Sequence, residues 1–164
     1  MKLILMRHAK AEKSELFADD FERPLTKRGF DDAALICKFL KQQKIIPKFI
    51  VASPSKRTIQ TAEIVAKFFD KQVSKTEYDY EIYEASINDL VHAIRRIPEK
   101  YKTVMLIGHN PSITGIIGYL TGNFIEHVST SGIAVLKFKT NNWQLTSQHC
   151  AELILLKNPK ELYS

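Results

Sequence analysis

Two histidines and two arginines follow three apolar runs of the sequence, and these residue types suit phosphoryl transfer. Arg7 and His8 follow the first run, Arg57 lies shortly after the second, and His109 follows the third. A guanidinium presents a planar pair of donors to phosphate oxygens and stays charged. A neutral imidazole is a good nucleophile near neutral pH, and neighbouring cations disfavour its protonation. We therefore expect His8 to accept a phosphoryl group.

The elements that must position these side chains alternate between strand and helix patterns. Short apolar runs at residues 3–6, 49–52 and 103–108 predict buried strands, and apolar residues at helical spacing predict an amphipathic helix over 27–42. Further helices are expected around 62–69, 90–97 and 113–120, and further strands at 72–77, 133–138 and 143–155. This order predicts a three-layer α/β/α fold with a mostly parallel mixed sheet of about six strands.

Ligands bind beyond the carboxyl ends of the strands in sheets of this kind. Arg7 and His8 lie at one such end, Ser53 at a second and His109 at a third. The helices that follow Ser53 and Asn110 would add free backbone N–H groups and a favourable dipole. The four charged or titratable side chains are therefore expected to converge at one edge of the sheet.

The bulk composition is that of a compact protein with a basic surface. The 164 residues include 45% hydrophobic residues, which suits a single domain over residues 1–164, and the net charge is +6. The charge fits either a solvated surface or attraction to anionic substrates, and without a dense basic block among aromatic residues we expect no nucleic-acid partner. Cys37 and Cys150 lack metal-ligand spacing and are expected to be reduced thiols.

The first apolar run is too short for a signal sequence or a membrane span, because it stops at Arg7. We therefore expect a cytoplasmic protein with no membrane partner. We also expect it to be a monomer.

Three segments carry a resemblance to a known family. Leu5-Met6-Arg7-His8-Ala9-Lys10-Ala11 resembles the RHG/RHA signature of the histidine phosphatase superfamily, which is phosphoglycerate-mutase-like. The segment from Ser53 to Ala62 is similar to its SxxxRxxQTA motif, and Ile107-Gly108-His109-Asn110-Pro111 matches its GHNP motif. The motifs occur in the family's order and spacing, and the resemblance extends from Met1 to about Leu155.

The details resemble one branch, the SixA-like phosphohistidine phosphatases. Ala9 stands where many members carry glycine, and Arg23-Pro24-Leu25-Thr26-x-Arg28-Gly29 follows the first motif as in that branch. Members of this branch are short and lack the cap insertions of larger relatives, and this chain likewise has no insertion after the His109 motif. An uncapped site is expected to be shallow and to admit a phosphorylated side chain of a folded protein.

The resemblance implies roles for the four converging residues. His8 would be the nucleophile that becomes phosphohistidine, and water would hydrolyse that intermediate. Arg7, Arg57 and His109 would bind the equatorial oxygens and, with His8, form the phosphate-binding set. No metal or other cofactor is expected, because side chains supply the positive charge and no carboxylates cluster in the sequence.

The general acid is open at this point. Many family members place an acidic residue after the third strand, and Glu84 lies in that region, as does Glu81. A surface glutamate before a helix cap is the competing interpretation of Glu84. A phosphohistidine substrate needs less help, since imidazole is a better leaving group than an alkoxide.

The leading hypothesis is a phosphatase acting on a phosphohistidine-bearing protein. The alternative is a phosphomonoesterase for a small sugar or nucleotide phosphate, and a third hypothesis is a silent phosphate- or nucleic-acid-binding module. Around the site, Asp19, Asp20 and Arg23 are expected to order the adjacent loop, and Lys10 to be solvated or to attract phosphate. His127 is a candidate for the pocket rim.

Overall fold

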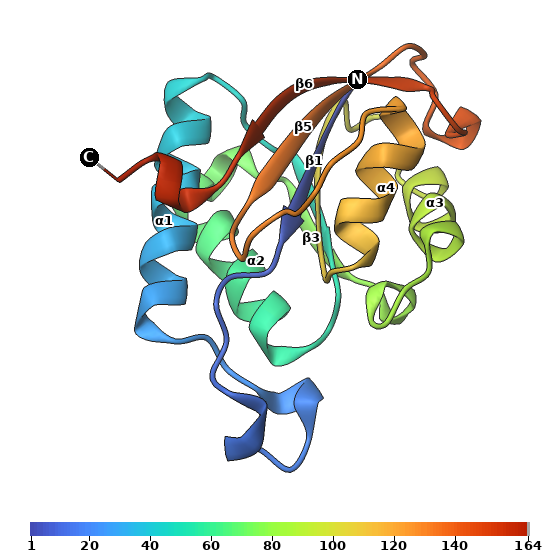
Figure 1. Ribbon diagram of the computed structural model, residues 1–164. Helices are drawn as coiled ribbons and strands as arrows, with labels where there is room; N and C mark the ends of the chain where they lie inside the picture. Colours follow the sequence, from blue (N-terminus) through green and yellow to red (C-terminus); the bar gives the residue numbers. More distant parts are fainter. Residues whose placement is uncertain (164) are drawn as a thin grey trace.

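A six-stranded mixed sheet forms the centre of the computed structural model, which describes residues 1–163 (Figure 1). The strands are β1 (Lys2–Arg7), β2 (Phe49–Ala52), β3 (Lys75–Tyr78), β4 (Thr103–Gly108), β5 (Ile133–Phe138) and β6 (Ala151–Lys157). Their order is β3-β2-β4-β1-β5-β6. The strands β3, β2, β4 and β1 are parallel to one another, and β5 pairs antiparallel with both β1 and β6. The mostly parallel mixed sheet predicted from the sequence is confirmed.

Four helices cover the two faces of the sheet. They are α1 (Lys27–Gln42), α2 (Lys56–Phe69), α3 (Ile87–Arg95) and α4 (Ser112–Thr121). In Figure 1, α1 and α2 lie on one side of the strands and α3 and α4 lie on the other. Local caps begin two of these helices: the Thr26 hydroxyl accepts from the backbone N–H of Gly29, and Ser86 with Asp89 forms a capping box. None of the helices within residues 1–163 combines the length and apolar character needed to cross a membrane.

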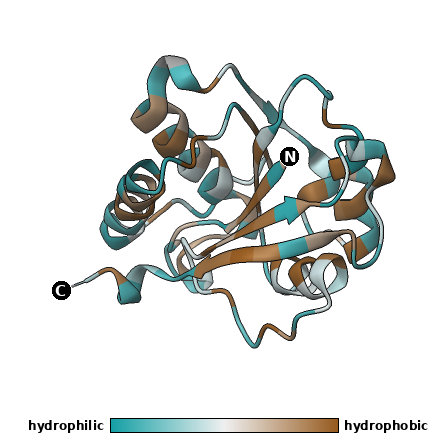
Figure 2. Ribbon diagram, turned by 90° about the horizontal axis from the view of Figure 1, so that it is seen from above, coloured by the Kyte–Doolittle hydropathy of each residue, from teal (hydrophilic) through white to brown (hydrophobic). Residues whose placement is uncertain are grey.

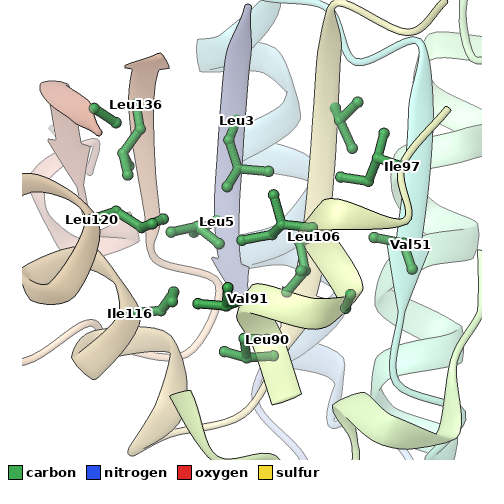
Figure 3. Packing of buried hydrophobic residues seen from close by; sticks show 14 of the residues in the cluster. Leu3, Leu5, Val51, Leu90, Val91, Ile97, Leu106, Ile116, Leu120 and Leu136 are labelled. Carbon is green, nitrogen blue, oxygen red and sulfur yellow. The ribbon is translucent and has the colours of Figure 1, made fainter. Parts of the chain in front are cut away.

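Successive side chains of the central strands point to opposite faces of the sheet, and this divides the core into two clusters. Leu3 and Leu5 of β1 point towards α3 and α4, whereas Ile4 and Met6 point towards α1 and α2. Figure 3 shows Leu3 and Leu5 packed with residues of the first cluster, and Figure 2 shows the apolar residues gathered along the inner faces of the elements. A strand buried on both faces needs a continuous apolar run, which explains why these strands were predictable.

The prediction of a strand over 143–155 is wrong at its start. Residues Trp143–Leu145 form a short 3-10 helix, η5, and β6 begins at Ala151. The indole N–H of Trp143 donates to the backbone oxygen of Tyr101 at 2.8 Å, and the Trp143 ring is fully buried against Phe138. This contact across the fold outweighs the local strand preference of the aromatic residue.

Candidate active site

The four residues singled out in the sequence meet at the carboxyl edge of β2, β4 and β1, which are neighbours in the sheet. Arg7 ends β1 and His8 follows it, His109 follows β4, and Arg57 lies in the first turn of α2, which follows β2. The ring centroids of His8 and His109 are 5.2 Å apart. A terminal nitrogen of Arg57 lies 3.4 Å from Nδ1 of His109. The structure therefore brings the predicted set together.

Hydrogen bonds fix the ring of His8 in one tautomer. Its Nδ1 lies 2.7 Å from the backbone oxygen of Ala9. A carbonyl oxygen can only accept, so Nδ1 carries the proton and Nε2 keeps its lone pair. The Ala9 peptide is itself held, because its N–H donates to the hydroxyl of Thr61, which in turn donates to the backbone oxygen of Arg57.

Burial keeps His8 neutral. It lowers the pKa of His8 to about 3, and the positive charges of Arg57 and Arg7 act in the same direction, while the hydrogen bond to Ala9 opposes them. The expectation that neighbouring cations disfavour protonation has the right sign, although burial is the larger cause. An unprotonated imidazole is the state that a nucleophile requires.

His109 is oriented by two partners. Its Nδ1 faces the Arg57 guanidinium, which can only donate, so Nε2 carries the proton and donates to the Ser53 hydroxyl at 2.8 Å. Burial, followed by the charge of Arg57, lowers the pKa of His109 to about 4. The sequence placed Ser53 at a strand end and at the start of a motif, but its role as the partner of His109 depends on a contact between residues that follow two different strands.

Asp20 holds Arg57 in place. The Arg57 guanidinium donates to the backbone oxygen of Asp20 at 2.8 Å and to its carboxylate at 3.0 Å. Arg23 donates to the same carboxylate at 2.8 Å and to the backbone oxygen of Glu12. Burial alone would raise the pKa of Asp20, but Arg57 and Arg23 outweigh it and hold that pKa below its ordinary value.

The charge at the site is only partly neutralised. Within residues 1–163 Arg7 has no ion pair: its guanidinium donates to the backbone oxygen of Val128 at 3.2 Å and lies 3.3 Å from Nε2 of His127. Arg57 and Arg23 share the single carboxylate of Asp20. Two neutral histidines and an excess of guanidinium charge make this edge of the sheet suited to a phosphate group.

A pocket of about 420 Å³ opens beside His109 and Arg57. Tyr83 forms one wall: its ring makes an edge contact with His109, and its hydroxyl donates to the Asp20 carboxylate at 3.2 Å. Glu84 is exposed and lines the same pocket, whereas Glu81 forms an ion pair with Arg96 at 3.0 Å and lines a different one. Of the two candidate acids, only Glu84 therefore lies beside the converging residues. No pattern in the sequence had marked Tyr83 as a site residue.

Other predicted residues occupy the surroundings. The Asp19 carboxylate accepts from the backbone N–H of Phe21 and begins the short helix η2 (Asp20–Glu22), so Asp19, Asp20 and Arg23 all contribute to the loop beside the site. Lys10 lines a separate pocket. Within residues 1–163, His, Cys, Asp and Glu side chains form no cluster of three or more that could hold a metal ion.

The family comparison agrees with this arrangement. Residues 3–89 match the model of the histidine phosphatase superfamily (branch 1). Phosphohistidine phosphatase SixA of Escherichia coli is 30% identical over 158 residues, covering 89% of this chain and 94% of that protein. The chain therefore belongs to the histidine phosphatase superfamily.

Solved structures place the chain near one branch. The protein histidine phosphatase SixA bound to tungstate superposes with a TM-score of 0.84 at 25% identity, covering 99% of this chain and 100% of that one. A structure described as a putative phosphohistidine phosphatase SixA from Agrobacterium tumefaciens has a TM-score of 0.81 at 26% identity, covering 96% and 97% of the two chains. The chain is thus a phosphatase with SixA-like neighbours, which confirms the resemblance found in its motifs.

Proposed function

We propose that this chain is a metal-independent phosphatase that removes the phosphoryl group from a phosphohistidine of another protein. The observation that carries the proposal is the neutral His8 ring, whose Nδ1 is held by Ala9 while Nε2 remains available. Arg7 precedes His8 in the chain, the His109 ring lies 5.2 Å from the His8 ring between centroids, and Arg57 contacts His109. The SixA proteins in the comparison support the substrate class by similarity.

In the first step, Nε2 of His8 attacks phosphorus in line. A P–N bond forms to His8 as the P–N bond to the substrate imidazole breaks, and the departing imidazole takes a proton from solvent. Arg7 and Arg57 offset the charge on the equatorial oxygens, and the N–H of His109 is redirected from Ser53 to one of these oxygens. These interactions stabilise the transition state without a metal ion.

In the second step, water attacks the phosphorylated His8. The P–Nε2 bond breaks, inorganic phosphate leaves, and the proton released by the water passes to solvent. His8 regains its lone pair, and the Nδ1 hydrogen bond to Ala9 persists throughout. The low pKa of His8, about 3 in the free protein, keeps the ring ready for another cycle.

The competing small-molecule activity has one observation in its favour. Glu84 lies on the rim of the 420 Å³ pocket, where a leaving alkoxide of a sugar or nucleotide phosphate would need a proton. A substrate panel separates the two activities. If the protein hydrolyses sugar phosphates but not a phosphohistidine peptide, the small-molecule phosphomonoesterase becomes the favoured function.

The covalent intermediate provides the direct test. Enzyme exposed briefly to radiolabelled phosphohistidine peptide is quenched in acid or in base. We expect bound label that survives base and is lost in acid, and that is absent from His8→Ala. Stable label in acid, or unchanged activity of His8→Ala, would overturn the assignment of the nucleophile.

A further inference from the structure

A second pocket of about 430 Å³ lies beside the candidate active site, and we call it the Lys10 pocket. It is formed by the loop after β1, the start of α1, the loop before β5 and the short helix η6 (Pro159–Glu161). Its lining residues are Lys10, Arg28, Asp32, Ser129, Thr130, Pro159 and Lys160. No residue used in the proposed mechanism lines this pocket.

The Lys10 pocket is adjacent to His8 along two paths of the backbone. Lys10 follows His8 by two residues, so their Cα atoms are at most about 7.6 Å apart. On the other wall, the residue after Thr130 is Ser131, whose N–H lies 3.1 Å from the backbone oxygens of both Arg7 and His8. The pocket is therefore close enough to His8 for side chains that flank a bound phosphohistidine to reach it.

The charges in the Lys10 pocket favour an anionic partner. Arg28 lies 3.6 Å from the buried Asp32 carboxylate, which also accepts from the Tyr163 hydroxyl. Lys10 and Lys160 form no ion pair within residues 1–163. Nearby carboxylates are engaged elsewhere: Asp31 with Lys27 at 3.1 Å, and Glu161 with Lys157 at 3.2 Å. Three cations thus face a single buried carboxylate.

The backbone of both walls is fixed by hydrogen bonds. The Lys10 oxygen accepts from the N–H of Thr26 at 2.9 Å and from its hydroxyl at 3.2 Å. The Asn158 side chain accepts from the N–H of Ser129 at 3.0 Å and from its hydroxyl at 2.9 Å, which joins the loop before β5 to the start of η6. The three cationic side chains therefore extend from backbone that is held by hydrogen bonds, which reduces the entropic cost of binding.

We infer that the Lys10 pocket is a docking surface for acidic side chains of the protein that carries the phosphohistidine. This inference rests on the proposed function, and it adds a recognition element beyond the phosphate itself. The lining contains no aromatic side chain on which a base could stack, which disfavours single-stranded nucleic acid. Flexible cations at an open surface match carboxylates on a folded partner or a peptide.

The test uses two phosphohistidine peptides of equal length, one with glutamates flanking the phosphohistidine and one with glutamines. We expect kcat/KM to be about five- to tenfold higher for the acidic peptide, as two or three exposed ion pairs would give. The difference should lie mainly in KM. It should disappear at about 1 M salt, where the Debye length is about 3 Å.

Variants assign the effect to the pocket. Arg28→Gln combined with Lys160→Gln should remove most of the preference for the acidic peptide and leave turnover of the glutamine peptide unchanged, because a glutamine at position 28 can still donate to the buried Asp32 carboxylate. Lys38→Gln is the control, because Lys38 is an exposed cation on the same helix α1 that does not line the Lys10 pocket. A preference that persists undiminished in the double variant, or that is lost equally in Lys38→Gln, would refute the inference.

A binding measurement separates this inference from the proposed function. Fluorescence anisotropy reports binding of the unphosphorylated peptides to His8→Ala and to His8→Ala with the double substitution. If the acidic peptide binds through the pocket but neither phosphorylated peptide is hydrolysed, the docking surface stands and the phosphohistidine activity fails. If both phosphopeptides are hydrolysed at equal rates and bind equally, the activity stands and the docking surface fails.

Discussion

The positions of individual side chains at the site depend on residues that would not touch the phosphoryl group. Arg57 is the clearest case, because two of its hydrogen bonds go to Asp20, one to the backbone and one to the carboxylate. The Asp20 carboxylate also receives the Tyr83 hydroxyl and is itself 46% exposed. In the proposed mechanism Asp20 therefore orients Arg57 without contacting the substrate.

Asp20→Ala should lower kcat by about tenfold to a hundredfold, because a misplaced guanidinium no longer matches the transition state. The backbone contact to Arg57 remains in both variants, but in Asp20→Asn the side-chain amide oxygen can still accept, so that variant should recover much of the lost rate. Steady-state kinetics on a phosphohistidine peptide measures both. Wild-type kcat in Asp20→Ala would show that Arg57 does not need this partner.

Glu84 provides a second prediction at the same scale. Glu84→Gln should leave phosphohistidine hydrolysis nearly unchanged, because imidazole leaves readily with a proton from solvent. Any residual hydrolysis of an alkyl phosphate should fall by about a hundredfold if Glu84 supplies the proton there. The ratio of the two activities is the measurement. An equal loss on both substrates would instead assign Glu84 a role in binding phosphate.

At the scale of elements, the start of α1 and the loop after β1 are in unusually close contact. A Cβ atom added at Gly29 would lie 2.3 Å from the backbone oxygen of Lys10, which is closer than real atoms approach. The same oxygen accepts two hydrogen bonds from Thr26, the cap of α1. The glycine thus allows the helix to fix the loop two residues beyond His8.

Gly29→Ala should destabilise the protein by about 1–3 kcal/mol, because backbone on one side or the other must shift. Activity should fall as well, since the shift reaches the peptide that follows His8. Gly115→Ala in α4 is the control: there the closest atoms belong to the flexible end of the Ile87 side chain, at 3.2 Å. Thermal unfolding and kcat are measured for Gly29→Ala and for Gly115→Ala. Equal effects would mean that the Lys10 contact is not responsible.

Features of the fold and the site that depend on local sequence patterns could be predicted. Features that depend on contacts between residues distant in the sequence could not. Buried strands and the residues at their ends could be predicted, because a continuous apolar run and the sheet topology suffice. The contact between Asp20 and Arg57 could not, because it spans 37 positions and depends on the path of an irregular loop. Likewise, Trp143 ends up in η5 rather than a strand because of its bond to Tyr101.

For the whole molecule, two buried neutral histidines couple stability to pH. When the protein is folded, the pKa values of His8 and His109 are about 3 and about 4, whereas in the unfolded chain a histidine pKa is about 6.5. The unfolded chain therefore binds more protons between these values, and the free energy of unfolding falls as the pH drops below about 6.5. At about pH 5 each histidine should have cost roughly 2 kcal/mol of stability.

Denaturant unfolding at about pH 7 and about pH 5 checks this coupling. His109→Gln should lose part of the pH dependence seen in the parent protein, because glutamine does not titrate. The exposed His92 on α3 provides the control variant, His92→Gln, which should keep the full dependence. An equal change in the free energy of unfolding between the two pH values, in the parent protein and in His109→Gln, would show that His109 does not contribute to the pH dependence.

The place of β1 in the sheet also affects how the chain assembles as it is synthesised. β1 is made first, yet its neighbours are β4 and β5, which extend to residues 108 and 138. A nascent chain that has not reached these residues leaves an apolar strand with both edges unpaired, a state prone to aggregation. His8 at the end of β1 thus emerges from the ribosome long before His109. The site around the proposed nucleophile can therefore form only after most of the polypeptide has been synthesised.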